Sequence, residues 1–280
     1  MGSQEGSLKM TVTELPVSAG EWRGRHLGTR RIAYDERDAI LYALAVGARA
    51  TDLDLVFEQR LRVLPTFALT LAQWAPDELG SLGAFDTRTA LHGSQRLDVL
   101  APIPRSGEIE MSARVGEVWD KGRAAVFEVV VESDHFTATW SLFAPGSGGF
   151  GGDRGPSAPP APEGEPDVVG TLVTDADQAA LYRLTGDHHH IHIDPDAAVR
   201  IGQPRPILHG LCTLAAATLP LAGMLGAHPA DLTTLFGRFA APVFPGDVAQ
   251  VRAWGQAGGA AFDVTTDGGP VLSGGHAAFS

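Results

Sequence analysis

The feature that most constrains the fold is a glycine- and proline-rich stretch that divides the chain into two halves of similar pattern. Residues 144–168 combine repeated glycines with a run of prolines that reaches Pro166, a composition typical of linkers between folded units. In each half a proline-containing segment, at 97–107 and 235–253, leads into alternating strands and turns. The halves therefore read as divergent copies of one unit, offset by about 140 residues.

The strands of each copy are indicated by the alternation of apolar and polar residues. Residues 109–115 alternate apolar and polar side chains, which is the period of a strand with one wet face. The expected turn and further strands are a turn at 119–123 and strands at 124–132, 136–143, 260–265 and 271–280. Strands that return on themselves after short turns favour antiparallel sheets.

Two segments are expected to be helical. Residues 37–50 are apolar nearly all round, which predicts a helix wrapped by other structure, with Asp35 as its N-terminal cap. A second apolar helix is expected from Leu211 to about Leu225, with the single cysteine, Cys212, buried inside it. One buried helix and several antiparallel strands in each half predict an α+β fold in which a curled sheet wraps a helix.

Composition excludes several function classes. The formal net charge of −12 disfavours sequence-blind binding to nucleic acid or anionic membranes. No apolar run approaches the ~20 residues that span a bilayer, and the polar residues 1–10 do not resemble a signal peptide. The C-terminal residues 278–280 do not match a peroxisomal address. With no disulfide framework to build, we expect a cytoplasmic protein.

Titratable residues concentrate in one short segment that carries the chemistry. Six of the eight positions from Asp187 to Asp194 are aspartate or histidine, and they lie between Gly186 and Pro195, which disfavour one continuous helix. A carboxylate and an imidazole five residues apart, at 187 and 192, can hold one water between them. The backbone N–H of Gly210, at the start of the second helix, can stabilise a developing oxyanion.

Other interpretations of the same segment are less favoured. The alternating His188, His190 and His192 suggest a metal site, but zinc sites need three or four convergent ligands and no cysteine pattern supports one. We expect no metal, and we expect His188 and His190 to be bystanders. Asp194, directly before Pro195, is expected to cap a short helix at 196–201.

The segment 186–195, followed by 206–211, resembles the hydratase motif of the MaoC-like family of (R)-specific enoyl-CoA hydratases, which have the hot-dog fold. The resemblance extends from about residue 34 to residue 280, and is greatest to members with two hot-dog units on one chain. The further matching segments are 37–44, which resembles the family's first central helix, and 63–67, 91–93, 120–122, 148–152 and 238–246.

The resemblance implies roles for individual residues. Asp187 and His192 would hold and activate the catalytic water, and Gly210 would donate its N–H to the thioester oxygen. The residues that fall where the family contacts acyl-CoA are His92, Gly93, Lys121 and Phe239. The family's usual asparagine is replaced here by His189, and the proline that often follows by His190. We expect His189 to border the substrate and to alter the pH optimum or the acyl chain accepted.

From the residues and the resemblance together we expect a double hot-dog: an N-terminal unit that accommodates the acyl chain (1–143), a linker (144–168) and a catalytic C-terminal unit (169–280). The expected reaction is reversible hydration of trans-2-enoyl thioesters to (3R)-3-hydroxyacyl thioesters, without a cofactor. The substrate is expected on CoA or on acyl carrier protein, and the protein is expected to form a homodimer. The alternatives are a dehydratase or cyclase acting on polyketide-like chains, a thioesterase, and a non-catalytic acyl-thioester binding protein.

Overall fold

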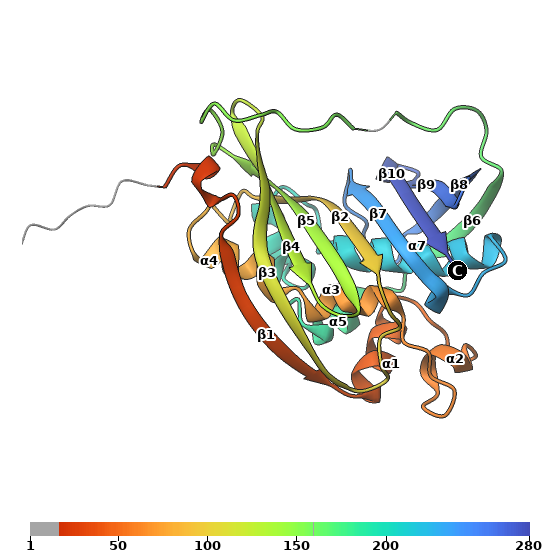
Figure 1. Cartoon of the computed structure of the whole chain (residues 1–280). Helices are drawn as coiled ribbons and strands as arrows, with labels where there is room; N and C mark the ends of the chain where they lie inside the picture. The colour runs from red at the N-terminus through yellow and green to blue at the C-terminus, as the bar shows by residue number, and fades with distance from the viewer. Residues whose placement is uncertain (1–16, 159) are drawn as a thin grey trace, which may run out of the picture.

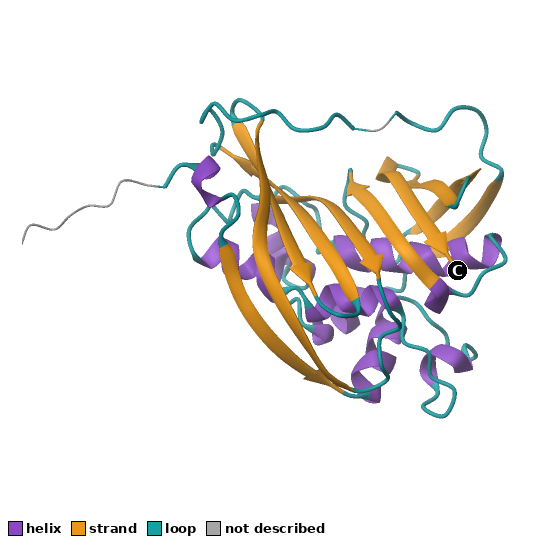
Figure 2. Cartoon of the chain, in the orientation of Figure 1, coloured by secondary structure: helices purple, strands orange, loops and turns teal. Residues whose placement is uncertain are grey.

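Ten strands dominate the structure, a computed structural model that describes residues 17–158 and 160–280 (Figures 1 and 2). The polar N-terminal segment 1–10 and the beginning of the expected first unit lie outside the described residues. The strands are β1 (His26–Tyr34), β2 (Leu91–Val99), β3 (Gly107–Asp120), β4 (Ala124–Glu132), β5 (Phe136–Pro145), β6 (Val168–Val173), β7 (Leu232–Phe239), β8 (Val248–Gln256), β9 (Gly259–Thr266) and β10 (Gly269–Phe279).

The ten strands form one sheet in the order β1-β3-β4-β5-β2-β7-β10-β9-β8-β6, and every pair is antiparallel. From each outer edge inward, the first half runs β1-β3-β4-β5-β2 and the second half β6-β8-β9-β10-β7, which is the same order. The halves join where β2 pairs with β7, with Leu97 opposite Leu235. Strands β2 and β7 begin 141 residues apart, so the predicted duplication is confirmed.

The helices pack on one side of this sheet, and α7 lies behind the second half in Figure 1. They are α1 (Glu36–Ala45), α2 (Leu53–Val56), α3 (Ala68–Leu71), α4 (Trp74–Ser81), α5 (Gln178–Tyr182), α6 (Pro195–Arg200) and α7 (Gly210–Met224), with the 3₁₀ turns η1 (Ala19–Trp22), η2 (Pro65–Phe67), η3 (Arg183–Thr185), η4 (His190–His192) and η5 (Pro229–Asp231). The expected helix 211–225 agrees with α7 to within one residue. The architecture is the α+β double hot-dog that was predicted.

The central helix of the first half lies elsewhere than the sequence suggested. Helix α7 packs on β6, β8 and β10, whereas in the first half α3 contacts β5 and α4 contacts β1, β3 and β4. The counterpart of α7 is therefore the interrupted pair α3–α4, and α1 corresponds to α5, which follows the second half's first strand. The prediction of a wrapped helix at 37–50 is wrong in role and length, because α1 ends at Ala45 and Gly47 adopts φ 104°.

Several local predictions are confirmed and others need correction. Asp35 caps α1 by accepting from the N–H of Asp38, whose side chain accepts from the N–H of Asp35 in return. The strand at 124–132 is present as expected, but the turn at 119–123 shortens to 121–123, because β3 continues to Asp120. The edge strands β1 and β6 were not predicted from the sequence. In β1 a glycine and two adjacent arginines hide the alternation of a strand.

The segment between β5 and β6 crosses from one half to the other along the top of Figure 1. Asp120 accepts hydrogen bonds from the backbone of Gly149 and Gly151, and the Phe150 ring packs on the core. We keep 144–168 as the proposed boundary between the units. In the described part of the chain, the structure contains no helix that is long and apolar enough to cross a membrane. Cys212 is buried, as expected, and its thiol lies 3.5 Å from the Ala45 carbonyl oxygen of the other half.

Candidate active site

A sharp turn after η3 places Asp187 at the centre of the site. Gly186 ends η3 with φ 138°, a conformation that favours glycine. The Asp187 carboxylate then accepts the backbone N–H of His189 at 3.1 Å, and the chain enters the short turn η4. The expectation that Gly186 and Pro195 prevent one continuous helix is confirmed, because η3, η4 and α6 are separate short elements. Asp194 caps α6 through the N–H of Asp196, as predicted.

His192 lies buried beside Asp187 with one ring nitrogen fixed by the backbone. Its Nδ1 lies 2.8 Å from the carbonyl oxygen of Ile207, and because a carbonyl can only accept, Nδ1 must carry the hydrogen. The neutral ring therefore has its lone pair on Nε2. Burial lowers the pKa of His192, although the charge of Asp187 opposes this shift. The side chain is thus a neutral base at ordinary pH.

A second buried histidine, His209, completes the group, and sequence analysis assigned it no chemical role. Its Nε2 donates to the backbone carbonyl of Asp187 at 3.2 Å, and its ring stacks on His192 with centroids 3.6 Å apart. Burial, reinforced by His192, lowers the pKa of His209 to about 3. A carboxylate oxygen of Asp187 and one ring nitrogen from each of His192 and His209 lie within 4.8 Å of one another. The one sequence feature that could have pointed to His209 is its position immediately before Gly210.

The geometry of this group suits a proton better than a metal ion. The planes of the two imidazoles are only 23° apart, so their in-plane lone pairs do not converge on one point. A zinc ion needs nitrogen ligands at about 2.0–2.1 Å along those lone pairs. His188 and His190, which raised the possibility of a metal site, are exposed and lie outside this group of three.

The start of α7 forms a second wall of the site. His209 is the N-cap of α7 but makes no side-chain cap hydrogen bond, so the first N–H groups of the helix have no partner in the helix. Gly210 is exposed, and a Cβ there would lie 3.0 Å from two carbons of the Phe239 ring. The Phe239 ring packs against His92, with centroids 4.6 Å apart. The structure therefore brings Gly210, Phe239 and His92 together, and their roles toward a substrate stay predictions.

His92 lies in the neighbourhood of Asp187. Burial lowers its pKa to about 4, and the charge of Asp187 acts in the opposite direction. Its Nε2 donates to the carbonyl of Ser94 at 3.1 Å. Gly93 lies in a bulge of β2 between His92 and Ser94, where a Cβ would be 3.3 Å from the Ser141 carbonyl oxygen.

The structure places Lys121 away from these residues. It lies in the turn between β3 and β4, and its amine donates to the backbone carbonyl of Arg154 in the linker. His189 stands at the edge of the site, exposed, with its ring centroid 6.2 Å from that of His192. Its role and that of Lys121 toward a substrate stay predictions.

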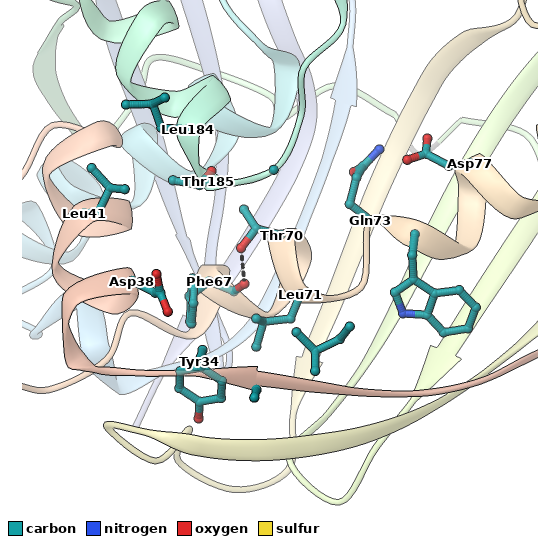
Figure 3. Close-up of a pocket in the computed structure, with 14 residues that line it drawn as sticks. Tyr34, Asp38, Leu41, Phe67, Thr70, Leu71, Gln73, Asp77, Leu184 and Thr185 are labelled. Atoms are coloured by element: carbon teal, nitrogen blue, oxygen red, sulfur yellow. Dashed lines mark hydrogen bonds between the residues drawn. The ribbon is translucent and has the colours of Figure 1, made fainter.

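A cavity of about 380 Å³ opens next to the loop that leads to Asp187 (Figure 3). It lies between α1, the α3–α4 pair and the turn that ends at Gly186, directly before Asp187. Asp77 of α4 lines this cavity, and its pKa is raised, first by burial and then by the charge of Asp187. Asp77 is nevertheless exposed to water. The first half thus contributes a wall next to the segment that carries Asp187, and this wall was not predicted from the sequence.

Comparison with known proteins identifies the class to which this fold and site belong. The model of the MFE-2 hydratase 2 N-terminal domain matches residues 32–144, and that of the MaoC-like domain matches residues 157–268. A crystal structure of a MaoC-like dehydratase from Phytophthora capsici superposes with a TM-score of 0.82 at 26% identity, over 92% of this chain and 96% of that one.

Curated relatives agree with the domain matches. The 3-hydroxyacyl-thioester dehydratase Y of Mycobacterium tuberculosis is 37% identical over 79% of this chain and 82% of the relative. The enoyl-CoA hydratase ChsH3 of the same organism is 35% identical, over 86% and 90%. The peroxisomal enoyl-CoA hydratase 2 of Arabidopsis thaliana is 32% identical, over 80% and 82%. The chain belongs to the MaoC-like hydratase family, in its double hot-dog form.

Proposed function

We propose that the protein catalyses the reversible addition of water to trans-2-enoyl thioesters, giving (3R)-3-hydroxyacyl thioesters. The observation that carries this proposal is that a carboxylate oxygen of Asp187 and a ring nitrogen of each of His192 and His209 lie within 4.8 Å of one another. His209 directly precedes Gly210, so the same contact that fixes Asp187 also positions the start of α7. The names of the relatives, which include a hydratase and a dehydratase, support both directions of the reaction.

The proposed mechanism uses one water held between the Asp187 carboxylate and Nε2 of His192. The base takes a proton from this water as its oxygen bonds to C3, and the electrons of the double bond move toward the thioester oxygen. The N–H of Gly210 donates to the resulting enolate oxygen. A proton returned to C2 from the same pair completes addition on one face. A neutral His192, maintained by its burial, is suited to begin this sequence.

The test is hydration of crotonyl-CoA, followed by loss of the absorbance of the conjugated thioester. Asp187→Asn should keep the acceptor for the His189 N–H but lose the charge, and should lower kcat about 100-fold or more. Asp196→Asn is the matched control, because this exposed aspartate lies nearby on α6. Equal rates for wild type and Asp187→Asn would refute the proposed catalytic role.

The same assay separates the alternatives. Release of free CoA with the double bond retained would indicate a thioesterase, and tight binding without turnover a non-catalytic acyl-thioester binding protein. A dehydratase or cyclase acting on polyketide-like chains would hydrate crotonyl-CoA poorly, but would still depend on Asp187 and His192. Replacing CoA with acyl carrier protein in the assay identifies the carrier.

We propose a homodimer, which light scattering of the purified protein would test. We also propose a cytoplasmic protein, although the Arabidopsis relative is named as peroxisomal. Fractionation of the source cells decides between the two compartments.

A further inference from the structure

The cavity beside Asp187 has two unlike sides. Gln73, the N-cap of α4, and Asp77 lie on one side, and Leu41 and Leu184 lie on the other together with Asp38, whose carboxylate accepts from the N–H of Asp35 (Figure 3). Thr185 lies between the two sides. An acyl chain needs only apolar walls, because its methylene groups form no hydrogen bonds. A carboxylate and an amide facing the same hollow therefore need a separate explanation.

Two polar atoms on the wall of this cavity have no partner in the described chain. They are Oε1 of Gln73 and the indole Nε1 of Trp74, and both are buried. A buried acceptor or donor left unpaired costs about 1–3 kcal/mol, and most such atoms in folded proteins are paired. Gln73, the N-cap of α4, and Asp77 are four residues apart and therefore lie on the same face of the helix start. One ligand group that both donates and accepts can therefore contact both side chains.

The polar side lies within the electrostatic influence of Asp187. Burial raises the pKa of Asp77, and the charge of Asp187 raises it further. A hydrogen bond from Gln73 acts in the opposite direction and favours the ionised carboxylate. A saturated chain laid against Gln73 and Asp77 would remove both from water without replacing their hydrogen bonds, which is unfavourable. A chain that carries an oxygen at this level would replace them.

We propose, on the basis of the hydratase function above, that the cavity selects acyl chains with a hydroxyl or carbonyl oxygen on the carbons just beyond the reacting double bond. Gln73 and Asp77 bind that oxygen, and the apolar part of the chain lies against Leu41 and Leu184. The substrate class is thus an oxygenated enoyl thioester.

Binding calorimetry tests the proposal without requiring turnover. The probes are octanoyl-CoA and its three isomers with a hydroxyl on carbon 4, 5 or 6. At least one isomer should bind about tenfold more tightly than octanoyl-CoA, since a site with fixed polar groups discriminates against a ligand that leaves them unpaired. The corresponding trans-2-octenoyl-CoAs should show the same order in kcat/KM.

Variants assign the discrimination to the polar wall. Gln73→Leu should bring the affinities for the hydroxylated and plain chains to within about twofold of each other, because it removes one of the hydrogen-bonding partners. Gln256→Leu makes the same change at an exposed position at the end of β8 and should preserve the discrimination. The wild-type comparison stands alone if Gln73→Leu fails to fold.

The outcomes separate this inference from the proposed function. Equal affinity of wild type for all four octanoyl thioesters overturns the inference, whether or not crotonyl-CoA is hydrated. Selective binding of a hydroxylated chain without hydration of any enoyl thioester supports the polar cavity and overturns the hydratase function.

Discussion

His192 and His209 stack face to face, with ring centroids 3.6 Å apart and planes tilted by 23°. Both rings are buried, and each has one nitrogen donating to a backbone carbonyl. A proton added to either ring would place a cation in a buried site against the other imidazole, which favours the neutral pair. This relationship makes the site a set of neutral bases around one carboxylate, and it has consequences for stability, pH dependence and metal binding.

Acid should destabilise the fold through His209. Its pKa is about 3 in the fold and ~6.5 in an unfolded chain, so between these values only the unfolded state binds the proton. Its contribution is complete above pH 6.5 and is lost as the pH falls, by about 2 kcal/mol at pH 5. Urea unfolding at pH 7.5 and 5.0 measures this loss. His209→Gln should reduce the difference between the two pH values, and His188→Gln, at an exposed position, should not.

Replacing His189 by asparagine should move the pH profile. The charge of His189 is one of the causes that lower the pKa of His192, so its removal raises that pKa. His192 then becomes protonated at a higher pH, and the acid limb of kcat/KM shifts upward. Asparagine can still accept the N–H of Ile191, as Nδ1 of His189 does now. His190 is also exposed, and His190→Asn is the control. The same shift of the pH profile in both variants would argue against a specific effect of His189.

Gly210→Ala should damage catalysis more than stability. The new Cβ would lie 3.0 Å from two carbons of Phe239, so the ring or the start of α7 must shift. Such a displacement of the oxyanion donor should lower kcat/KM about 10- to 100-fold. Adding Phe239→Leu should recover part of the loss by making space. Gly223→Ala, in the same helix with nothing within 4 Å of its Cβ, is the control and should retain full activity.

Removal of metal ions should leave hydration unchanged. The nearly parallel planes of His192 and His209 prevent their lone pairs from meeting at one ion, and the proposed mechanism needs only a water. Dialysis against a chelator, followed by the crotonyl-CoA assay, should give the same kcat as before. A loss of activity that added zinc restores would contradict this prediction.

Some features of the site could be read from the sequence because they depend on neighbours in the chain. The turn at Gly186, the cap at Asp194 and the start of a helix at Gly210 are local, since glycine, aspartate and proline act on the backbone within a few residues. The pairing of Asp187 with His192 is of this kind, as the two are separated by only one short turn. The duplication could be predicted because the strands of the antiparallel hairpins show the same alternation of apolar and polar residues in each half.

Other features came only from the tertiary structure. The interrupted helix pair α3–α4 follows no clear sequence period, and its place as the counterpart of α7 is decided by the strands it packs on. The charge of Asp187 in the second half raises the pKa of Asp77 in the first half. The ring of His92 in the first half packs against that of Phe239 in the second half. The sequence by itself determined the duplicated pattern, the segment that holds Asp187 and His192, and the local turns. Packing of one half on the other decided which distant side chains surround that motif, because burial and charge depend on neighbours in space.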